Sequence, residues 1–184
     1  MAQTETIQTD RLVLRVPTEA DADEITLRIG VKAVAWHLGR APFPYARSDA
    51  DSFIANAIEN WANDKAYVFV AEYADEGVIG CVGLDLHGDD IWEIGYWIGQ
   101  PWWGKGFVSE AASAVMDWGK AKGMSKFVSG HFVDNPASGR VLEKLGFVSV
   151  GIVDHIGAAR GGPSPAQRYA LGASPQDALR TASH

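Results

Sequence analysis

The sequence is poor in cysteine, in long apolar runs and in positive charge, and each shortage excludes a class of protein. Cys81 is the single cysteine among 184 residues, so no internal disulfide can form, which fits a reducing cytoplasm. No apolar run approaches the roughly 20 residues needed to span a bilayer, and the polar first ten residues lack the charged-then-apolar plan of a signal peptide. The formal net charge of -7 opposes non-specific binding to nucleic acid. We therefore expect a cytoplasmic protein that binds neither membranes nor nucleic acids.

The length and composition predict one globular domain. A chain of 184 residues that is 47% hydrophobic and 21% charged can bury a substantial core. We expect this domain over residues 1–172, with a polar and mobile tail over residues 173–184. Because Cys81 lies inside an apolar run, we expect it to be a core residue rather than a nucleophile.

Hydrophobic periodicity predicts strands and helices in an order that implies a mixed sheet with helices on both faces. The predicted strands are residues 12–16, 66–73, 78–87, 91–98, 126–133, 147–152 and 167–171. Helices are expected after two cap patterns, Thr18 with Asp21 and Ser48 with Asp51, and over residues 108–119 and 136–145. Residues 157–166, rich in Gly and Pro, are expected to form a loop. These elements indicate an α+β fold with α/β/α layers and a mostly antiparallel sheet of about six or seven strands.

The segment PWWGKGFVSEA, residues 101–111, lies between a predicted strand and a predicted helix. Gly104 and Gly106 allow a tight turn that brings several N–H groups together, and the helix start adds its own free N–H groups. Lys105 adds a positive charge. A connecting turn explains a lone G-x-G equally well, but the flanking strand, helix and lysine favour a site for a di- or triphosphate. The spacing differs from the G-x-x-x-x-G-K-[ST] of P-loop nucleotide-binding proteins, which excludes that class.

This segment resembles the acyl-CoA pyrophosphate loop of the GNAT acetyltransferase superfamily, and it is most similar to the ribosomal-protein N-acetyltransferases of the RimJ/RimL type. The superfamily pattern has Gln or Arg three residues before the first glycine, where this chain has Pro101. The resemblance implies the GNAT fold, acetyl-CoA as acyl donor, CoA as product and no metal. The cofactor-binding residues that it implies are Ile98, Trp103, Gly104, Lys105, Gly106, Phe107, Val108, Ser109, Asn135, Ser138, Arg140 and Lys144.

A second motif is N-P-A-S at residues 135–138, followed by L-E-K-L-G-F at residues 142–147. From spacing alone, Asn135 caps a helix and Ser138 is a solvated residue of its first turn. The two segments resemble motif B of the superfamily, in which the Asn contacts the pantetheine arm. Many members carry a Tyr acid where this chain has Leu142, so the resemblance implies that Ser138 returns the proton to the CoA thiolate. Arg140 and Lys144 either reach the cofactor phosphates or form a solvated helix face.

Amine acetylation requires that an ammonium group lose a proton. At pH 7 this costs about 4–5 kcal/mol for a lysine-like ammonium and about 1 kcal/mol for a protein α-amino group. The best candidate for the base is Glu93, which lies among aromatic residues on the strand that leads to the phosphate loop. Such a carboxylate is either solvated or held in a cleft with a raised pKa. Related sequences often carry a catalytic Glu on the matching strand, which favours Glu93. The alternatives are Glu72, Asp85, His87 and His131.

The superfamily's layout implies an acceptor pocket built from residues 34–45 and the loop after Ile152. The substrate-binding residues it implies are Trp36, His37, Tyr45 and Glu93. The predicted activity is N-acetylation by direct attack of a primary amine, which is a protein N-terminus, a polyamine or another small amine. An acyl-CoA-binding sensor without turnover is the alternative. Exposed tryptophans would favour a homodimer.

Overall fold

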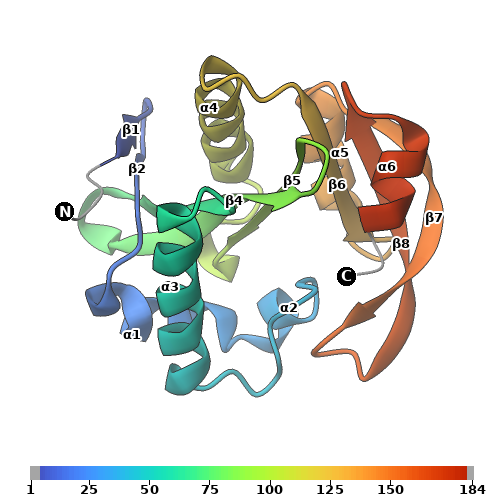
Figure 1. The fold of residues 1–184 in the computed structure, drawn as a ribbon. Coiled ribbons are helices and arrows are strands. Elements are labelled where there is room, and N and C mark those ends of the chain that lie inside the picture. Colours follow the sequence, from blue (N-terminus) through green and yellow to red (C-terminus); the bar gives the residue numbers. More distant parts are fainter. Residues whose placement is uncertain (1–4, 182–184) are drawn as a thin grey trace.

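The computed structural model describes residues 5–181, and its centre is one eight-stranded sheet (Figure 1). The strand order is β1-β2-β3-β4-β5-β6-β8-β7, and every neighbouring pair is antiparallel except β5 with β6. The strands are β1 (Thr6–Gln8), β2 (Val13–Arg15), β3 (Ala66–Glu72), β4 (Val78–His87), β5 (Ile91–Ile98), β6 (Lys126–Phe132), β7 (Val148–Gly157) and β8 (Gly162–Leu171). The α+β prediction is confirmed. The count of about six or seven strands was one short, because β1 pairs with β2 and adds an edge strand.

Helices cover both faces of the sheet, as expected (Figure 1). They are α1 (Ala22–Ile29), α2 (Lys32–Ala35), α3 (Arg47–Ala62), α4 (Phe107–Ala121), α5 (Pro136–Lys144) and α6 (Pro175–Arg180). Alternation along β3 shows the layering. Phe69 packs in a core with Val115 of α4, whereas the next residue, Val70, packs with Ile25 of α1 and Ile54 of α3. Successive residues of β3 thus pack into two separate cores, one on each face of the sheet.

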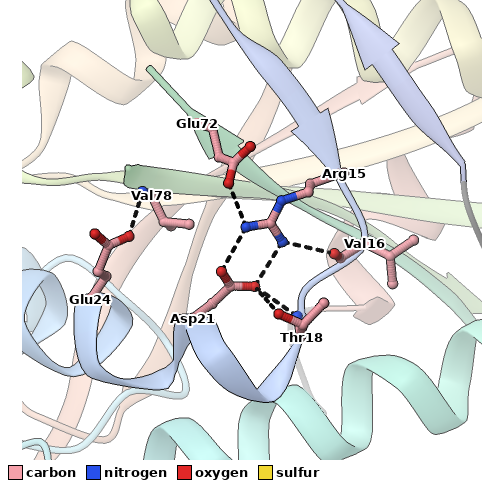
Figure 2. Close-up of polar contacts among 7 residues, drawn as sticks. All are labelled: Arg15, Val16, Thr18, Asp21, Glu24, Glu72 and Val78. Carbon is pink, nitrogen blue, oxygen red and sulfur yellow. Dashed lines mark hydrogen bonds and ion pairs between the residues drawn. The ribbon is translucent and has the colours of Figure 1, made fainter. Parts of the chain in front are cut away.

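An ion-pair network centred on the buried Asp21 joins β2, β3 and the start of α1 (Figure 2). The predicted cap is confirmed, because the Asp21 carboxylate accepts a hydrogen bond from the Thr18 N–H at 2.7 Å. Arg15 donates to both oxygens of Asp21, at 2.8 and 2.7 Å, and to Glu72 at 2.6 Å. Burial would raise the pKa of Asp21, but the hydrogen bonds from Arg15 and Thr18 outweigh it and lower that pKa. Beside this network, Glu24 accepts from the Val78 N–H at 2.6 Å and holds α1 on β4.

The second predicted cap lies elsewhere. Helix α3 begins at Arg47, and the Asp49 carboxylate accepts from the Ala46 N–H at 2.7 Å. Ser48 and Asp51 both lie within the helix. The pattern therefore predicted the helix correctly but placed its start two positions too late.

The loop predicted over residues 157–166 is largely strand. β7 and β8 form a long hairpin whose pairing runs from Val148 with Ala170 to Gly157 with Gly162. Two prolines, Pro163 and Pro165, lie within β8. They are tolerated because β6 pairs with β8 only as far as Ala166, so the side of β8 beyond that residue needs no ladder donors.

The tail predicted over residues 173–184 contains a helix, which corrects that prediction for its described part. Ser174 and Asp177 form a reciprocal cap at the start of α6. Ala178 is fully buried, and its carbonyl accepts from Arg168 of β8 at 3.0 Å. Residues 182–184 lie outside the described residues. The cap and the Arg168 contact explain why a polar segment folds onto the sheet.

Candidate functional site

The site begins where β5 and β6 part. Their parallel ladder comprises three residue pairs and ends at Glu93 with Val128. Just beyond it, the buried Ser129 hydroxyl donates to the Ile94 carbonyl at 2.8 Å. A cavity of about 960 Å³ then opens between β5, β6, α5 and the segment that follows α2. The edge of β5 that faces this gap has backbone groups available to an extended ligand.

One end of the cavity, which we call the loop end, gathers the glycine motif and helix α5. Nearly all of the residues predicted to bind the cofactor line it: Ile98, Trp103, Gly104, Gly106, Phe107, Val108, Ser109, Asn135, Ser138, Arg140 and Lys144. Lys105 is exposed and does not line the cavity; its carbonyl accepts from Arg11 at 3.0 Å. The two motifs, about 30 residues apart in the chain, therefore meet in one site.

The backbone of the glycine motif has the form that an anion site requires. Gly104 and Gly106 have φ of 73° and 82°, a left-handed region that favours glycine. A Cβ added to Gly104 would meet nothing within 4 Å, so its backbone faces open space. The Glu110 N–H donates to the Gly106 carbonyl at 3.1 Å, and the N–H groups of the preceding first-turn residues have no helical acceptor. This donor set fits the pyrophosphate of CoA.

The glycine motif is braced from the N-terminal segment. Glu110 accepts from the Thr9 hydroxyl at 2.6 Å, from the Arg11 N–H at 2.8 Å and from the Arg11 Nε at 2.7 Å. The Arg11 guanidinium also lies 4.1 Å from the ring centre of Phe107. The sequence does not predict this brace, since the partners of Glu110 lie about 100 residues away.

Ser138 meets a tyrosine that the sequence analysis did not single out. Asn135 caps α5, as predicted, with its Oδ1 accepting from the Ser138 N–H at 3.4 Å. The hydroxyl of Tyr96, on β5, lies 2.9 Å from the Ser138 hydroxyl and donates to the Ser138 carbonyl at 3.1 Å. Burial raises the pKa of Tyr96, which keeps its hydroxyl protonated. Leu142, at the position of the usual Tyr acid, is fully buried.

Glu93 lies beside the cavity rather than among its lining residues. Its Oε1 accepts from Arg168 at 2.7 Å and its Oε2 lies 2.9 Å from His87 Nε2. Burial would raise the pKa of Glu93, but His87 and Arg168 outweigh it and lower that pKa to about 2. Arg168 also donates to the hydroxyl of Thr181 at 2.7 Å. Glu93 as the base stays a prediction, and these partners disfavour it.

A second part of the cavity lining, which we call the far end, includes His37, Arg40, Tyr45, Asp49 and Asp85. It adjoins the loop end, since the ring centroids of His37 and Trp103 are 6.4 Å apart. Two of the predicted substrate-binding residues, His37 and Tyr45, are thus present here. Burial lowers the pKa of His37, although Asp134 opposes this, and burial raises the pKa of Tyr45 to about 12.

Trp36 supports this end from outside the lining. Its Nε1 donates to Asp134 at 3.2 Å and its carbonyl accepts from Arg160 at 2.9 Å. Arg160 comes from the turn between β7 and β8, is 6% exposed, and donates to Asp134 at 2.7 Å. Its guanidinium lies 3.8 Å from the ring centre of Phe132. The hairpin and the segment after α2 are thereby fastened together above the far end.

Residues 5–181 contain no group of three or more His, Cys, Asp or Glu side chains that could hold a metal ion. In the same part of the chain no helix is both long enough and apolar enough to cross a membrane. Cys81 is buried, as expected, and burial raises the pKa of its thiol.

Comparison with known proteins places this site in a family. A family model described as an acetyltransferase (GNAT) domain matches residues 11–148. The uncharacterized N-acetyltransferase YoaA of Bacillus subtilis (strain 168) is 30% identical over 169 residues, which cover 90% of this chain and 95% of that protein. The uncharacterized N-acetyltransferase p20 of Bacillus licheniformis is 29% identical over 163 residues, 85% of this chain and 90% of that protein.

Solved structures agree with this assignment. The microcin C7 self-immunity acetyltransferase MccE, in complex with acetyl-CoA and AMP, has a TM-score of 0.76 and 25% identity, and the match covers 88% of this chain and 92% of MccE. RimL, the ribosomal L7/L12 α-N-protein acetyltransferase, in complex with CoA, has the same fold. Its TM-score is 0.78 at 21% identity, with 92% of this chain and 100% of RimL covered. The phosphate loop, the parting strands and the matched sequence agree, and the chain belongs to the GNAT acetyltransferase family.

Proposed function

We propose that the protein is an acetyl-CoA-dependent N-acetyltransferase that acetylates a primary amine. The observation that carries this proposal is the continuity of the cavity, which runs from the first turn of α4, past Ser138, to the carboxylate of Asp85. A cavity of about 960 Å³ is within the size range of small-molecule sites. The relatives YoaA and p20 carry the name N-acetyltransferase, which supports the same reaction type.

The loop end supplies the binding of the donor. The N–H groups of Phe107, Val108 and Ser109 and the nearby charges of Arg140 and Lys144 would hold the phosphates of CoA. The free edge of β5 would pair with the amide groups of the pantetheine arm, which lie about as far apart as strand amides. The bound donor supplies an acetyl thioester next to Ser138.

Ser138 would act as the acid that protonates the departing thiolate. Its hydroxyl is held in the first turn of α5 by the Asn135 cap and faces Tyr96. Either hydroxyl can be the donor in this pair; when Tyr96 donates to Ser138, the Ser138 proton is free to point toward the departing thiolate. This arrangement uses a serine where other family members use a tyrosine, in keeping with the buried Leu142.

Thiol release from acetyl-CoA, measured with a panel of amines and peptides, tests the proposal. The panel includes a polyamine, peptides with free N-termini and small amines, because the acceptor is the least constrained part. We expect release above the amine-free rate for at least one class, and none with Gly104→Val. If acetyl-CoA binds by calorimetry while no amine releases thiol, the sensor without turnover replaces this proposal. A cytoplasmic location and a homodimer remain part of the proposal, and light scattering tests the latter.

A further inference from the structure

Two carboxylates at the far end occupy equivalent strand positions but different environments. Asp85 of β4 and Glu93 of β5 are direct partners in the ladder, so their side chains project from the same face. Glu93 is held by Arg168 and His87 and does not line the cavity. Asp85 does line it, and its Oδ2 accepts from Arg40 at 2.6 Å. Asp85 is therefore the carboxylate of this pair that lines the cavity.

Arg40 is a loosely held partner. Its side chain is 87% exposed, compared with 26% for Asp85, although the guanidinium lines the cavity beside Asp85. Exposed ion pairs contribute about 0–1 kcal/mol. A cationic ligand that offers Asp85 a charge-assisted hydrogen bond can therefore displace Arg40 at little cost.

The floor beside Asp85 is formed by two glycines and the side chain of Val68. The next ladder pair on the same face is Gly83 with Gly95, and a Cβ added to Gly95 would meet nothing within 4 Å. Gly95 also lies just beyond the last β5–β6 pair, where the free edge of β5 begins. A group bound at Asp85 thus has a clear approach toward the strand edge. Asp49 also lines the cavity, and its carboxylate accepts from the Ala46 N–H.

We propose that the reacting ammonium group of the acceptor binds Asp85 by displacing Arg40, and that Asp85 takes its proton. The acceptor is then a cationic amine without an acidic group beside it, because such a group would meet the carboxylate of Asp85. This inference rests on the proposed function. The neutral nitrogen bonds the acetyl carbon and the C–S bond breaks. Ser138 protonates the thiolate, the second proton of the nitrogen restores the Ser138 hydroxyl through water, and the proton on Asp85 leaves to solvent.

Kinetics of two variants test the assignment, with spermidine, alaninamide and alanine as acceptors. Asp85→Asn should lower kcat/KM for spermidine by about 10²–10⁴-fold at pH 7, the usual contribution of a positioned base. That deficit should shrink as pH approaches 10, where free amine forms unaided. The other titratable or charged groups that line this part of the cavity or neighbour Asp85 are Arg40, Tyr45, Asp49, Cys81, His87 and Glu93. Titration of these groups does not convert the substrate ammonium to free amine, so it does not produce the expected recovery at high pH. Wild-type enzyme should prefer alaninamide to alanine.

The direction in which Arg40→Ala changes KM distinguishes two roles of Arg40. It is either a competitor that the substrate ammonium displaces or a group that binds an anionic part of the substrate. Removing the competitor should lower the KM for spermidine by up to about fivefold, since an exposed pair contributes at most about 1 kcal/mol. Asp117→Asn and Arg180→Ala, which remove exposed charges on α4 and α6, are the matched controls. Loss of activity in Arg40→Ala, or a wild-type pH profile in Asp85→Asn, overturns the inference.

A binding measurement keeps the test independent of turnover. Calorimetry of spermidine with the CoA-bound protein should show tenfold or weaker affinity in Asp85→Asn and equal or tighter affinity in Arg40→Ala. Equal affinity in wild type and Asp85→Asn overturns the inference, even if acetyl transfer occurs. Conversely, Asp85-dependent binding without thiol release for any amine contradicts the proposed function and leaves the cation site standing. Thermal unfolding checks that each variant is folded.

Discussion

The hydroxyl groups of Tyr96 and Ser138 lie 2.9 Å apart although the two residues are 42 positions apart in the chain. Tyr96 comes from the strand that borders the cavity, and Ser138 from the first turn of the helix on its other side. The contact spans the gap left by β5 and β6. It places a proton donor chain next to the free strand edge, where the acyl group of a bound donor would lie.

Removing the Ser138 hydroxyl should slow turnover more than it weakens donor binding. We expect Ser138→Ala to lower kcat by about 10²-fold or more, the usual cost of losing a general acid, with acetyl-CoA affinity within a few-fold of wild type. Tyr96→Phe should cost about tenfold or less, because one neutral hydrogen bond contributes about 1 kcal/mol. In the double variant the two effects should not add. Wild-type turnover in Ser138→Ala would show that water or another group protonates the thiolate.

The phosphate loop can be tested with a glycine matched in conformation. Gly104→Val should abolish measurable acetyl-CoA binding by calorimetry, because a β-branched residue resists a φ of 73° and projects toward the cavity. Gly123 has a φ of 93° and also meets nothing within 4 Å, but it lies at the end of α4 away from the site. Gly123→Val should therefore introduce similar backbone strain but leave the affinity for acetyl-CoA at the wild-type value. Equal affinity in Gly104→Val and wild type would remove the loop from the donor site.

We expect that substitution of Glu93 lowers the stability of the fold. Glu93→Gln leaves the guanidinium of Arg168, whose side chain is 5% exposed, without its charge partner, and breaking a buried pair costs about 3–5 kcal/mol. Since the pKa of Glu93 is lowered to about 2, its stabilisation is present above the unfolded value and is lost as pH falls toward 2.

Thermal unfolding from pH 2 to 7 measures this effect, with the exposed Glu59→Gln as control. The wild type should lose its advantage over Glu93→Gln as the solution becomes more acidic. A 10²-fold loss of turnover with unchanged stability would instead restore Glu93 as the base.

We expect the Asp21 carboxylate to contribute to the free energy of unfolding through its ion pair with Arg15. Asp21→Asn removes the charge that Arg15 meets at 2.7 Å, which we expect to cost about 3 kcal/mol, or a fall in Tm of about 6–12 °C. Because the folded pKa of Asp21 is lowered, its contribution is present above about pH 4 and is lost as pH falls below that value. Asp23→Asn, which removes an exposed carboxylate from the same helix, should change Tm little. Equal Tm values for the two variants would contradict this contribution.

Local signals in the sequence predicted local structure well. The Thr18 cap, the Asn135 cap and the glycine turn each depend on residues within three or four positions, and the structure contains all three. The cap of α6 had the same kind of signal, Ser174 followed by Asp177, and was overlooked because the segment is polar. The extent of β8 was hidden by its prolines, which normally indicate a loop.

The partners of the site residues could not be predicted in the same way. Whether Glu93 faces a cavity or a cation depends on Arg168, 75 positions away, and on the order in which β6 and β8 follow β5. Asp85 and Glu93 look alike in sequence, and the sheet gives one of them a buried counter-ion and the other an exposed one. Strand register and sheet order decide such pairs, and neither is encoded in a short window of residues.

The clasp between Arg160 and the segment after α2 has a consequence for recombination among relatives. Arg160 donates to the Trp36 carbonyl and to Asp134, so the roof of the far end belongs jointly to three stretches of the chain. A chimera that exchanges only the β7–β8 hairpin, or only residues 34–45, would leave the nearly buried guanidinium of Arg160 without its matching partners or remove it from them. A chimera should therefore transfer the acceptor pocket of a relative only when these distant segments are exchanged together.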